Sequence, residues 1–294
     1  MISPKEIDGT LGRLTYQALL LEVARARERP DSSLDVRDLT FRAYVTRAKG
    51  HADAPSVYFE NQKLLDRALV LAPEDLLALR VTAEVNLCEC LRDWTTDVSK
   101  MEKIGVAALD KYLGIRPDVP HMLAFRSMIF VKHRRYEEAL FVSEDVLRRE
   151  PKSLMALLAR VDAMLGLGRL PEAVTASHAL LSASDSAAAY ASAAVVQFVV
   201  RDNVLAAQLA RKSISKLPNK GLADPLIGSV VLTLAAAEAR AGNTQGARTA
   251  LADFYAVVPN VRTVSQIKTW LLPESIVPEG EDFFAALRLA GVGE

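Results

Sequence analysis

A spacing of 34 residues constrains the fold of this chain more than any other feature of its sequence. Ala139 and Ala173 stand 34 positions apart, and each follows an acidic residue. Twelve positions beyond them come Pro151 and Asp185, which occupy equivalent places. Because a small side chain lets two helices cross closely and proline ends a helix, we expect a series of related helix pairs. The same spacing of twelve recurs in Asn61 and Pro73, Gly105 and Pro117, Ala206 and Pro218, and Ala247 and Pro259.

Units of this length, with a small residue at the helix crossing and proline near the closing turn, resemble tetratricopeptide repeats. Two antiparallel helices cannot bury their apolar faces alone, so such units stack on copies of themselves. The expected fold is all-α, a right-handed α-α superhelix or tetratricopeptide-like solenoid. We expect about six repeats over residues 34–260, an N-terminal amphipathic helix within residues 1–33, and a C-terminal helical cap over residues 261–294.

Turn residues divide the repeat region into its helices. Most of the expected turns contain Gly, Asn, Asp or Pro, residues that commonly end helices. No stretch alternates apolar and polar residues strongly enough to predict a strand. The expected helix pairs are 34–49 with 55–71, 74–92 with 95–114, 119–132 with 136–149, 152–167 with 171–181, 185–200 with 203–217, and 222–241 with 244–257.

The N-terminal region predicts one helix over residues 3–29, ended by Pro30. Apolar residues recur there at steps of three and four, which places them on one face of a helix. This helix matches no repeat unit, and it could cap the array, lie in its groove or pair with a second copy. We call its apolar face the N-terminal stripe; it consists of Ile7, Leu11, Leu14, Ala18 and Leu21.

Charge and cysteine content restrict the partners. The formal net charge is +0, whereas nucleic-acid binders carry a basic stripe and membrane-anchored segments a polybasic cluster. No apolar run reaches the roughly 18 residues of a membrane span, so we expect no membrane insertion. Cys88 and Cys90 lie two positions apart on an expected helix and point to nearly opposite sides, so they cannot bridge each other. The sequence therefore favours a cytoplasmic protein.

Chemistry-bearing residues are few. The four histidines, His51, His121, His133 and His178, form no zinc-ligand or His-x-x-x-His spacing, and the glycines form no phosphate-binding loop. We therefore predict no catalytic, cofactor or metal site and no enzyme activity in this chain. The alternative is a helical small-molecule-binding protein or enzyme with a pocket inside the superhelix, for which only His121 and Asp162 offer ionisable side chains.

The first helix of each repeat is expected to line the concave surface, so its inward residues decide what binds there. These residues are largely apolar and lack the Lys and Asn that clamp a peptide carboxylate in chaperone-binding repeats. A large exposed apolar surface marks a partner site, and a groove of this kind takes an amphipathic helix. The alternative is that packing between repeats buries these side chains, which the exposure of Met128, Leu158 and Phe198 tests. The predicted partner-binding groove is His121, Ala124, Met128, Val131, Met155, Leu158, Asp162, Leu165, Val195, Phe198 and Leu232.

Both ends of the repeat region resemble one bacterial family. Residues 281–294, EDFFAALRLAGVGE, resemble a closing motif that reads Leu-Arg-Lys-Ala-Gly-Leu-Pro-Glu, with Leu289 in place of the Lys and Gly293 in place of the Pro. Residues 260–267, NVRTVSQI, and residues 36–43, VRDLTFRA, resemble its segment after the last repeat and its entry helix. The family is the repeat region of bacterial adenylate/guanylate cyclases and related winged-helix transcription regulators.

This resemblance implies a regulatory role. In that family the repeat region follows a catalytic or DNA-binding domain, and the repeats leave no room for one here, so any cyclase activity would reside elsewhere. We expect a non-catalytic protein-interaction or regulatory module of a bacterial signalling protein, either standalone or part of a larger chain. Its groove would bind an apolar helix or loop of a protein or peptide partner. The alternative is a homodimerisation scaffold, in which the partner is a second copy of the chain.

Overall fold

The structure is a computed structural model that describes residues 21–22, 24–25, 29–30, 33–48, 55–89, 98–217, 225–271 and 280–294. These residues form α-helices joined by turns, with one isolated parallel β-bridge between Thr263 and Gly293. Most of the predicted helix over residues 3–29 lies outside the described residues, although residues 21–22 and 24–25 are helical. The all-α prediction is confirmed.

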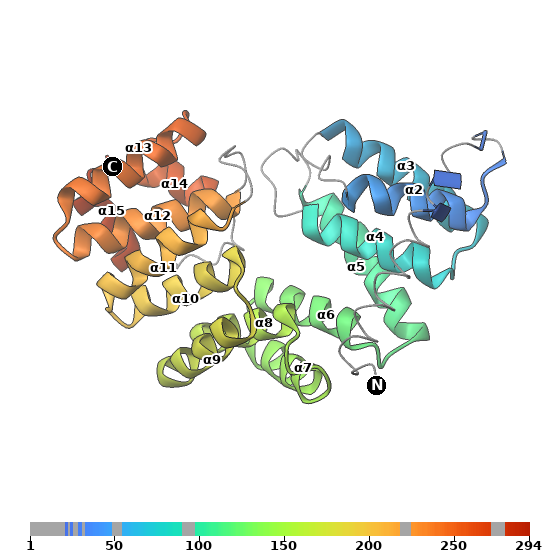
Figure 1. The fold of residues 1–294 in the computed structure, drawn as a ribbon, viewed down its shortest axis with the longest axis horizontal. Helices are drawn as coiled ribbons and strands as arrows, with labels where there is room; N and C mark the ends of the chain where they lie inside the picture. The colour runs from blue at the N-terminus through green and yellow to red at the C-terminus, as the bar shows by residue number, and fades with distance from the viewer. Residues whose placement is uncertain are drawn as a thin grey trace, which may run out of the picture. The chain divides into compact units, whose positions relative to one another are not determined.

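The helices fall into two compact units, residues 1–117 and residues 118–294, and Figure 1 labels their helices in chain order. In each unit, consecutive helices pack as pairs, α2 on α3 and α4 on α5 in the first, and α6 on α7 through α12 on α13 in the second. The division into residues 1–33, 34–260 and 261–294 stays a prediction. Unit 1 contains α2 (Val36–Ala48), α3 (Pro55–Leu71), α4 (Leu76–Glu89) and α5 (Val98–Ile115).

Unit 2 stacks four helix pairs and then a tail of two helices. Each first helix packs on the first helix of the next pair, so α6, α8, α10 and α12 form one layer, which we call the inner helices. The pairs are α6 (Pro120–Lys132) with α7 (Tyr136–Arg149), α8 (Leu154–Gly166) with α9 (Leu170–Ala183), α10 (Ala187–Val199) with α11 (Asn203–Ser215), and α12 (Pro225–Arg240) with α13 (Thr244–Val257). The tail is α14 (Val264–Trp270) and α15 (Glu281–Ala290).

The small residues of the repeat frame lie where the helices cross. Ala139, Ala173, Ala206 and Ala247 are fully buried in the second helices of the four pairs. A larger side chain at such a point would push the paired helices apart, because protein interiors are close-packed. The spacing seen in the sequence therefore records a packing requirement that repeats from pair to pair.

The turn inside each pair of unit 2 also repeats. One residue per turn has a positive φ: Arg134 (58°), Gly168 (70°), Arg201 (70°) and Gly242 (80°). The next residue donates its backbone N–H to a carbonyl five positions earlier, as Arg169 does to Met164 at 2.9 Å. This is the Schellman arrangement that ends a helix with a left-handed residue. Two turns use glycine, which adopts this conformation freely, and two use arginine, which does not.

The tail is tied to the last pair by backbone and charge. Thr263 forms a capping box with Gln266 at the start of α14, and the Val264 N–H donates to the Gly293 carbonyl at 2.8 Å. On α15, Asp282 pairs with Arg240 of α12 and lies 2.9 Å from the Arg201 guanidinium. These contacts hold α15 against α12, where a further repeat would otherwise stack.

Candidate partner-binding groove

The structure divides the predicted groove residues into two groups. Five of them keep part of their surface exposed and six are buried. Of the three residues that test the hypothesis, Met128 is partly exposed, whereas Leu158 and Phe198 are buried. The partly exposed group is His121, Met128, Val131, Met155 and Leu165, and the buried group is Ala124, Leu158, Asp162, Val195, Phe198 and Leu232.

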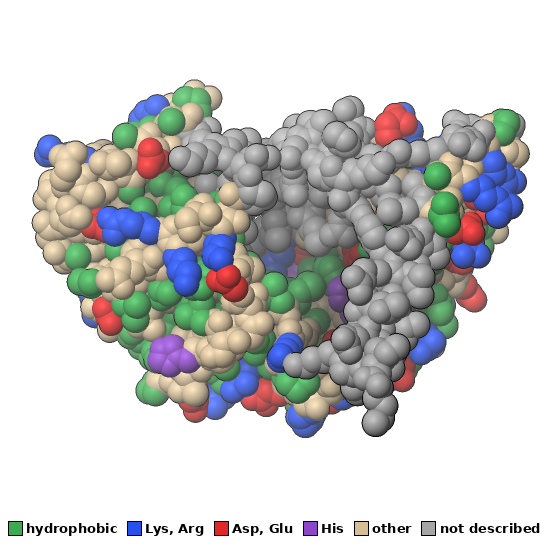
Figure 2. Space-filling view, viewed as in Figure 1, with side chains coloured by type: hydrophobic (Ala, Val, Ile, Leu, Met, Phe, Trp, Pro, Cys, Tyr) green, Lys and Arg blue, Asp and Glu red, His purple; other side chains and the backbone are tan. Residues whose placement is uncertain are grey.

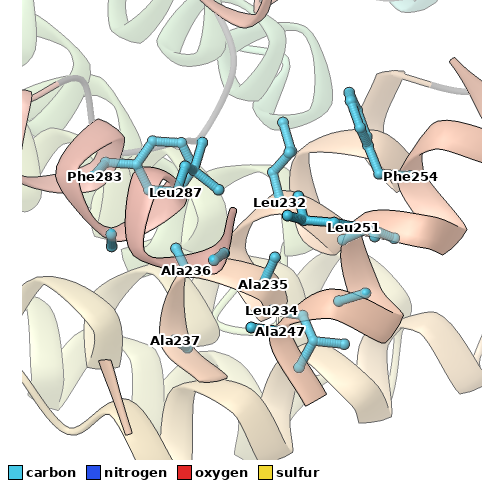
Figure 3. Packing of buried hydrophobic residues seen from close by; sticks show 14 of the residues in the cluster. Leu232, Leu234, Ala235, Ala236, Ala237, Ala247, Leu251, Phe254, Phe283 and Leu287 are labelled. Atoms are coloured by element: carbon cyan, nitrogen blue, oxygen red, sulfur yellow. The ribbon is translucent and has the colours of Figure 1, made fainter. Parts of the chain in front are cut away.

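The tail accounts for the burial at the C-terminal end of the groove. The Phe283 ring of α15 meets Phe198 edge-to-face with 5.7 Å between centroids, and the Arg240 guanidinium lies 4.2 Å from the centre of the Phe198 ring. Leu232 is fully buried and belongs to the same core cluster as Phe283 and Leu287 of α15, as Figure 3 shows. A partner therefore cannot reach Phe198 while α15 is in place, and Leu232 lies inside the same core.

All five partly exposed residues lie on α6 and α8. Four of them are apolar, and on α8 Met155 and Leu165 lie on the same side as the buried Leu158 because the spacings of three and seven residues return to one face of a helix. We call the surface made by Met128, Val131, Met155 and Leu165 the open groove. It is the part of the predicted groove that an incoming helix can still contact.

Asp162 lies between the positions of the open groove on α8. Its carboxylate accepts a hydrogen bond from the Ser192 hydroxyl of α10 at 3.5 Å, a long contact. Only 9% of the residue is exposed. Burial raises the pKa of the Asp162 carboxyl to about 7, and the Ser192 hydrogen bond opposes this shift. A buried carboxyl with one weak partner is unfavourable unless another group pairs with it.

No charged side chain among the described residues contributes to the pKa of Asp162. Helix α10, which packs against α8, carries no charged residue, and α6 carries Arg126 and Lys132. On α8 itself the charged neighbour is Arg160. The charged residues of the outer helices α7 and α9 are Glu137, Glu138, Glu144, Asp145, Arg148, Arg149 and Glu172, with His178 as a further titratable group.

The two residues considered for catalysis have different surroundings. His121 packs edge-to-face on Phe125 of its own helix, 5.2 Å between ring centroids. Asp162 accepts its hydrogen bond from Ser192, and its pKa carries no histidine contribution. Among the residues the structure describes, no three His, Cys, Asp or Glu side chains come together as a metal-binding group. Likewise, none of the described helices is both long and apolar enough to cross a membrane.

The visible surface carries no large patch of one charge over the described residues. Figure 2 shows Lys and Arg side chains interspersed with Asp and Glu over α10 to α13. Many of these charges form local pairs, such as Arg169 with Glu172 and Arg211 with Glu238. On this face the described residues therefore form no continuous basic stripe.

Comparison with solved structures identifies the architecture. The chain is similar to PilW, described as a widely conserved type IV pilus biogenesis factor, with a TM-score of 0.55 and 16% identity over 87% of this chain and 99% of PilW. It is also similar to a tetratricopeptide repeat protein from Parabacteroides merdae, with a TM-score of 0.57 and 14% identity over 97% of this chain and 96% of that protein. The chain has a tetratricopeptide-repeat fold.

A third solved structure with this fold is PilF of Pseudomonas aeruginosa, with a TM-score of 0.53 and 13% identity over 80% of this chain and 96% of PilF. No known family profile and no curated protein sequence matches the chain significantly. Identities this low show the fold alone. The resemblance of residues 36–43, 260–267 and 281–294 to cyclase-associated repeat regions therefore stays a prediction.

Sequence reasoning missed two features of the site. Ser192 was not among the predicted groove residues, although it supplies the hydrogen bond of Asp162; a serine within an alanine-rich helix was the available signal. The cover over Phe198 was also missed. It depends on Asp282, which lies 42 residues from Arg240, and no local pattern links residues so far apart.

Proposed function

We propose that this chain is a non-catalytic protein-interaction module whose open groove binds an apolar helix of a protein partner. The observation that carries the proposal is the row of partly exposed apolar side chains on consecutive inner helices, Met128 and Val131 on α6 and Met155 and Leu165 on α8. Helix-in-groove recognition uses anchors at i, i+3, i+4 and i+7, and such a helix can lie across the inner helices and contact each in turn.

The energetics favour a preformed surface. The inner helices are fixed by buried crossings such as Ala139 and Ala173, so the groove loses little conformational freedom when a partner binds. Burial of apolar area contributes about 25 cal/mol per Å², and the surplus over the entropy lost on association decides the affinity. Because the scaffold is rigid, most of the conformational entropy lost on binding is lost by the partner.

The proposal also includes the kind of protein in which the module works. The closing motif over residues 281–294 and the entry helix over residues 36–43 support a regulatory role in a cytoplasmic bacterial signalling protein. In this role the groove would couple a partner helix to a cyclase or winged-helix domain. Sequencing of the reading frame around this chain tests the setting, since a catalytic or winged-helix domain is the expected neighbour.

A photocrosslinker tests the groove directly. Met128 is replaced by p-benzoylphenylalanine in the full-length chain, and a matched variant carries the same residue at Glu144, which is exposed on the outer helix α7. We expect adducts at position 128 that map to amphipathic peptides with an apolar face, and none of these at position 144. Identical adducts at both positions, or adducts without an apolar helical sequence, would contradict the proposal.

A further inference from the structure

The N-terminal stripe continues into a basic residue. Its members follow one another at steps of four, three, four and three, and a further step of four reaches Arg25. An arginine therefore stands in line with the apolar face of the predicted helix. At the described end of the stripe, Leu21 is 71% exposed and Arg25 is also exposed. The stripe is thus an apolar face that its own unit leaves uncovered at this end.

Unit 1 holds the C-terminal end of this segment. Arg29 pairs with Asp38 of α2 and donates to the Ser33 carbonyl at 2.8 Å, and Arg42 donates to the Arg29 carbonyl at 2.7 Å. Asp38 is itself buried, so Arg29 is fixed at the start of α2. Leu21 and Arg25, both exposed, come shortly before this anchored residue in the chain.

The open groove of unit 2 has the complementary chemistry. It offers apolar side chains on two successive inner helices. Asp162 is buried on α8 between Met155 and Leu165, with the Ser192 hydroxyl as its hydrogen-bond donor. A buried carboxylate without a cation nearby is an uncompensated charge. A guanidinium that enters the groove on an apolar helix would pair with the carboxylate and compensate that charge. A helix with one arginine in line with its apolar face fits both features.

We propose that the open groove binds the N-terminal segment, residues 3–29, of a second copy of this chain, with Arg25 paired to Asp162. This inference rests on the proposed function and names its partner. Residues 3–25 span about 33 Å as a helix, and inner helices pack 8–10 Å apart, so the stripe is long enough to cross α6, α8 and α10. Reciprocal exchange of the two segments gives a closed two-fold dimer with two equivalent interfaces.

Mixing two defective variants tests the exchange. In the full-length chain, Leu14→Glu breaks the stripe and Met128→Glu breaks the open groove. We expect the unmodified chain to be a dimer by size-exclusion chromatography with light scattering and each variant to be a monomer with unchanged helix content by circular dichroism. A mixture of the two variants should form a dimer, because the intact stripe of one meets the intact groove of the other.

The ion pair is tested by a double-mutant cycle on the dimer dissociation constant. Arg25→Gln and Asp162→Asn should each weaken the dimer at least about tenfold, and the double variant should be weakened no more than either single one. As a control, Arg27→Gln changes a neighbouring arginine that does not continue the stripe, and it should leave the constant within about twofold. Additive effects of Arg25→Gln and Asp162→Asn would overturn the pairing.

The outcomes separate this inference from the function on which it rests. A full-length chain that is monomeric at all concentrations overturns the exchange, as does a dimer that neither Leu14→Glu nor Met128→Glu weakens. If such a monomer still gives foreign apolar-helix adducts at position 128, the groove function stands with another partner. If it gives no adducts at position 128, both proposals fail.

Discussion

Helices α8 and α12 hold equivalent places in their repeats, but their inner faces have different surroundings. Asp162 on α8 stands eleven residues before the crossing alanine Ala173. The equivalent residue on α12 is Ala236, eleven residues before Ala247. Ala236 is fully buried in the core that includes α15, whereas α8 keeps Met155 and Leu165 partly exposed beside its buried carboxyl. At this position α12, which the chain covers with its own helix, has an alanine, whereas α8 has a buried acid between its partly exposed apolar residues.

This difference indicates two kinds of cover. An apolar helix of the same chain covers α12 without any charge in the middle of the contact, because its ion pairs lie at the edge, where Asp282 meets Arg201 and Arg240. An acid in the middle of a contact selects its partner instead, since a helix without a cation leaves the carboxylate unpaired. Under the proposed function, the buried acid would serve to discriminate between partners at the open groove, whereas the apolar contact of α15 with α12 serves stability.

Removal of a buried side chain from the cover should produce the largest effect. Leu287 on α15 is fully buried, and Leu287→Ala should lower the free energy of unfolding by about 2–5 kcal/mol because it leaves a cavity in the core. Hydrogen exchange should accelerate in α12 and remain unchanged in α8. Leu289→Ala on the same helix is the control, because Leu289 is 68% exposed, and it should have little effect. Equal acceleration in α8 and α12 would show that the two faces are not separate.

The acid of the open face should produce a pH dependence that the covered face lacks. Burial raises the pKa of Asp162 to about 7 in the folded chain. At pH values between the ordinary pKa of an aspartate and about 7, the carboxyl of Asp162 therefore binds a proton when the chain folds. Stability from this group is therefore greatest at low pH and falls as the pH rises from about 4 to about 7, by at most about 4 kcal/mol. Asp162→Asn should remove this slope, as followed by chemical denaturation of the Leu14→Glu chain, whose groove we expect to be empty.

Asp185 provides a control of opposite sign. Hydrogen bonds from Lys216 and Tyr190 lower the pKa of its carboxyl, so its stabilising contribution is present at neutral pH and lost as the pH falls through the lowered value. Asp185→Asn should therefore lower stability by the same amount throughout pH 4 to pH 7, so that the decline over this range stays intact, and should lose its effect at the acidic end, where the carboxyl of Asp185 is itself protonated. A decline that persists in Asp162→Asn would mean that another group causes it.

The helices and their inner positions could be predicted from the sequence, but which inner positions are covered by the tail could not. The bounds of α7 and of α13 follow from the repeat and its turn residues, because those signals are local. The cover over α12 depends on contacts between Phe198 and Phe283, 85 residues apart in the chain, which no periodicity marks. Sequence reasoning therefore found the inner positions on α6 to α12, whereas packing decided which of them stay exposed.

The close approach of the tail to α12 predicts a smaller effect on the covered face. A Cβ atom at Gly228 would overlap the Trp270 ring of α14, and Trp270 is also held edge-to-face by Phe254 at 5.2 Å. Gly228→Ala should destabilise the chain by about 1–3 kcal/mol, as overpacking does. In a Trp270→Leu background the same substitution should have a smaller effect. Equal losses in both backgrounds, by thermal unfolding, would show that Trp270 does not limit the space at Gly228.

The turns within the pairs should give the smallest effect and should not distinguish the two faces. Gly168 lies in the turn between α8 and α9, and Gly242 lies in the turn between α12 and α13. Both have a positive φ and open space around an added Cβ. Gly168→Ala and Gly242→Ala should each lower stability by about 1 kcal/mol, because an L-residue is strained there. Gly114→Ala has the same open space without a positive φ and lies within α5, so it should stabilise by about 0.5–1 kcal/mol. If Gly242→Ala is far more costly than Gly168→Ala, the faces differ in the repeat itself and not only in what covers them.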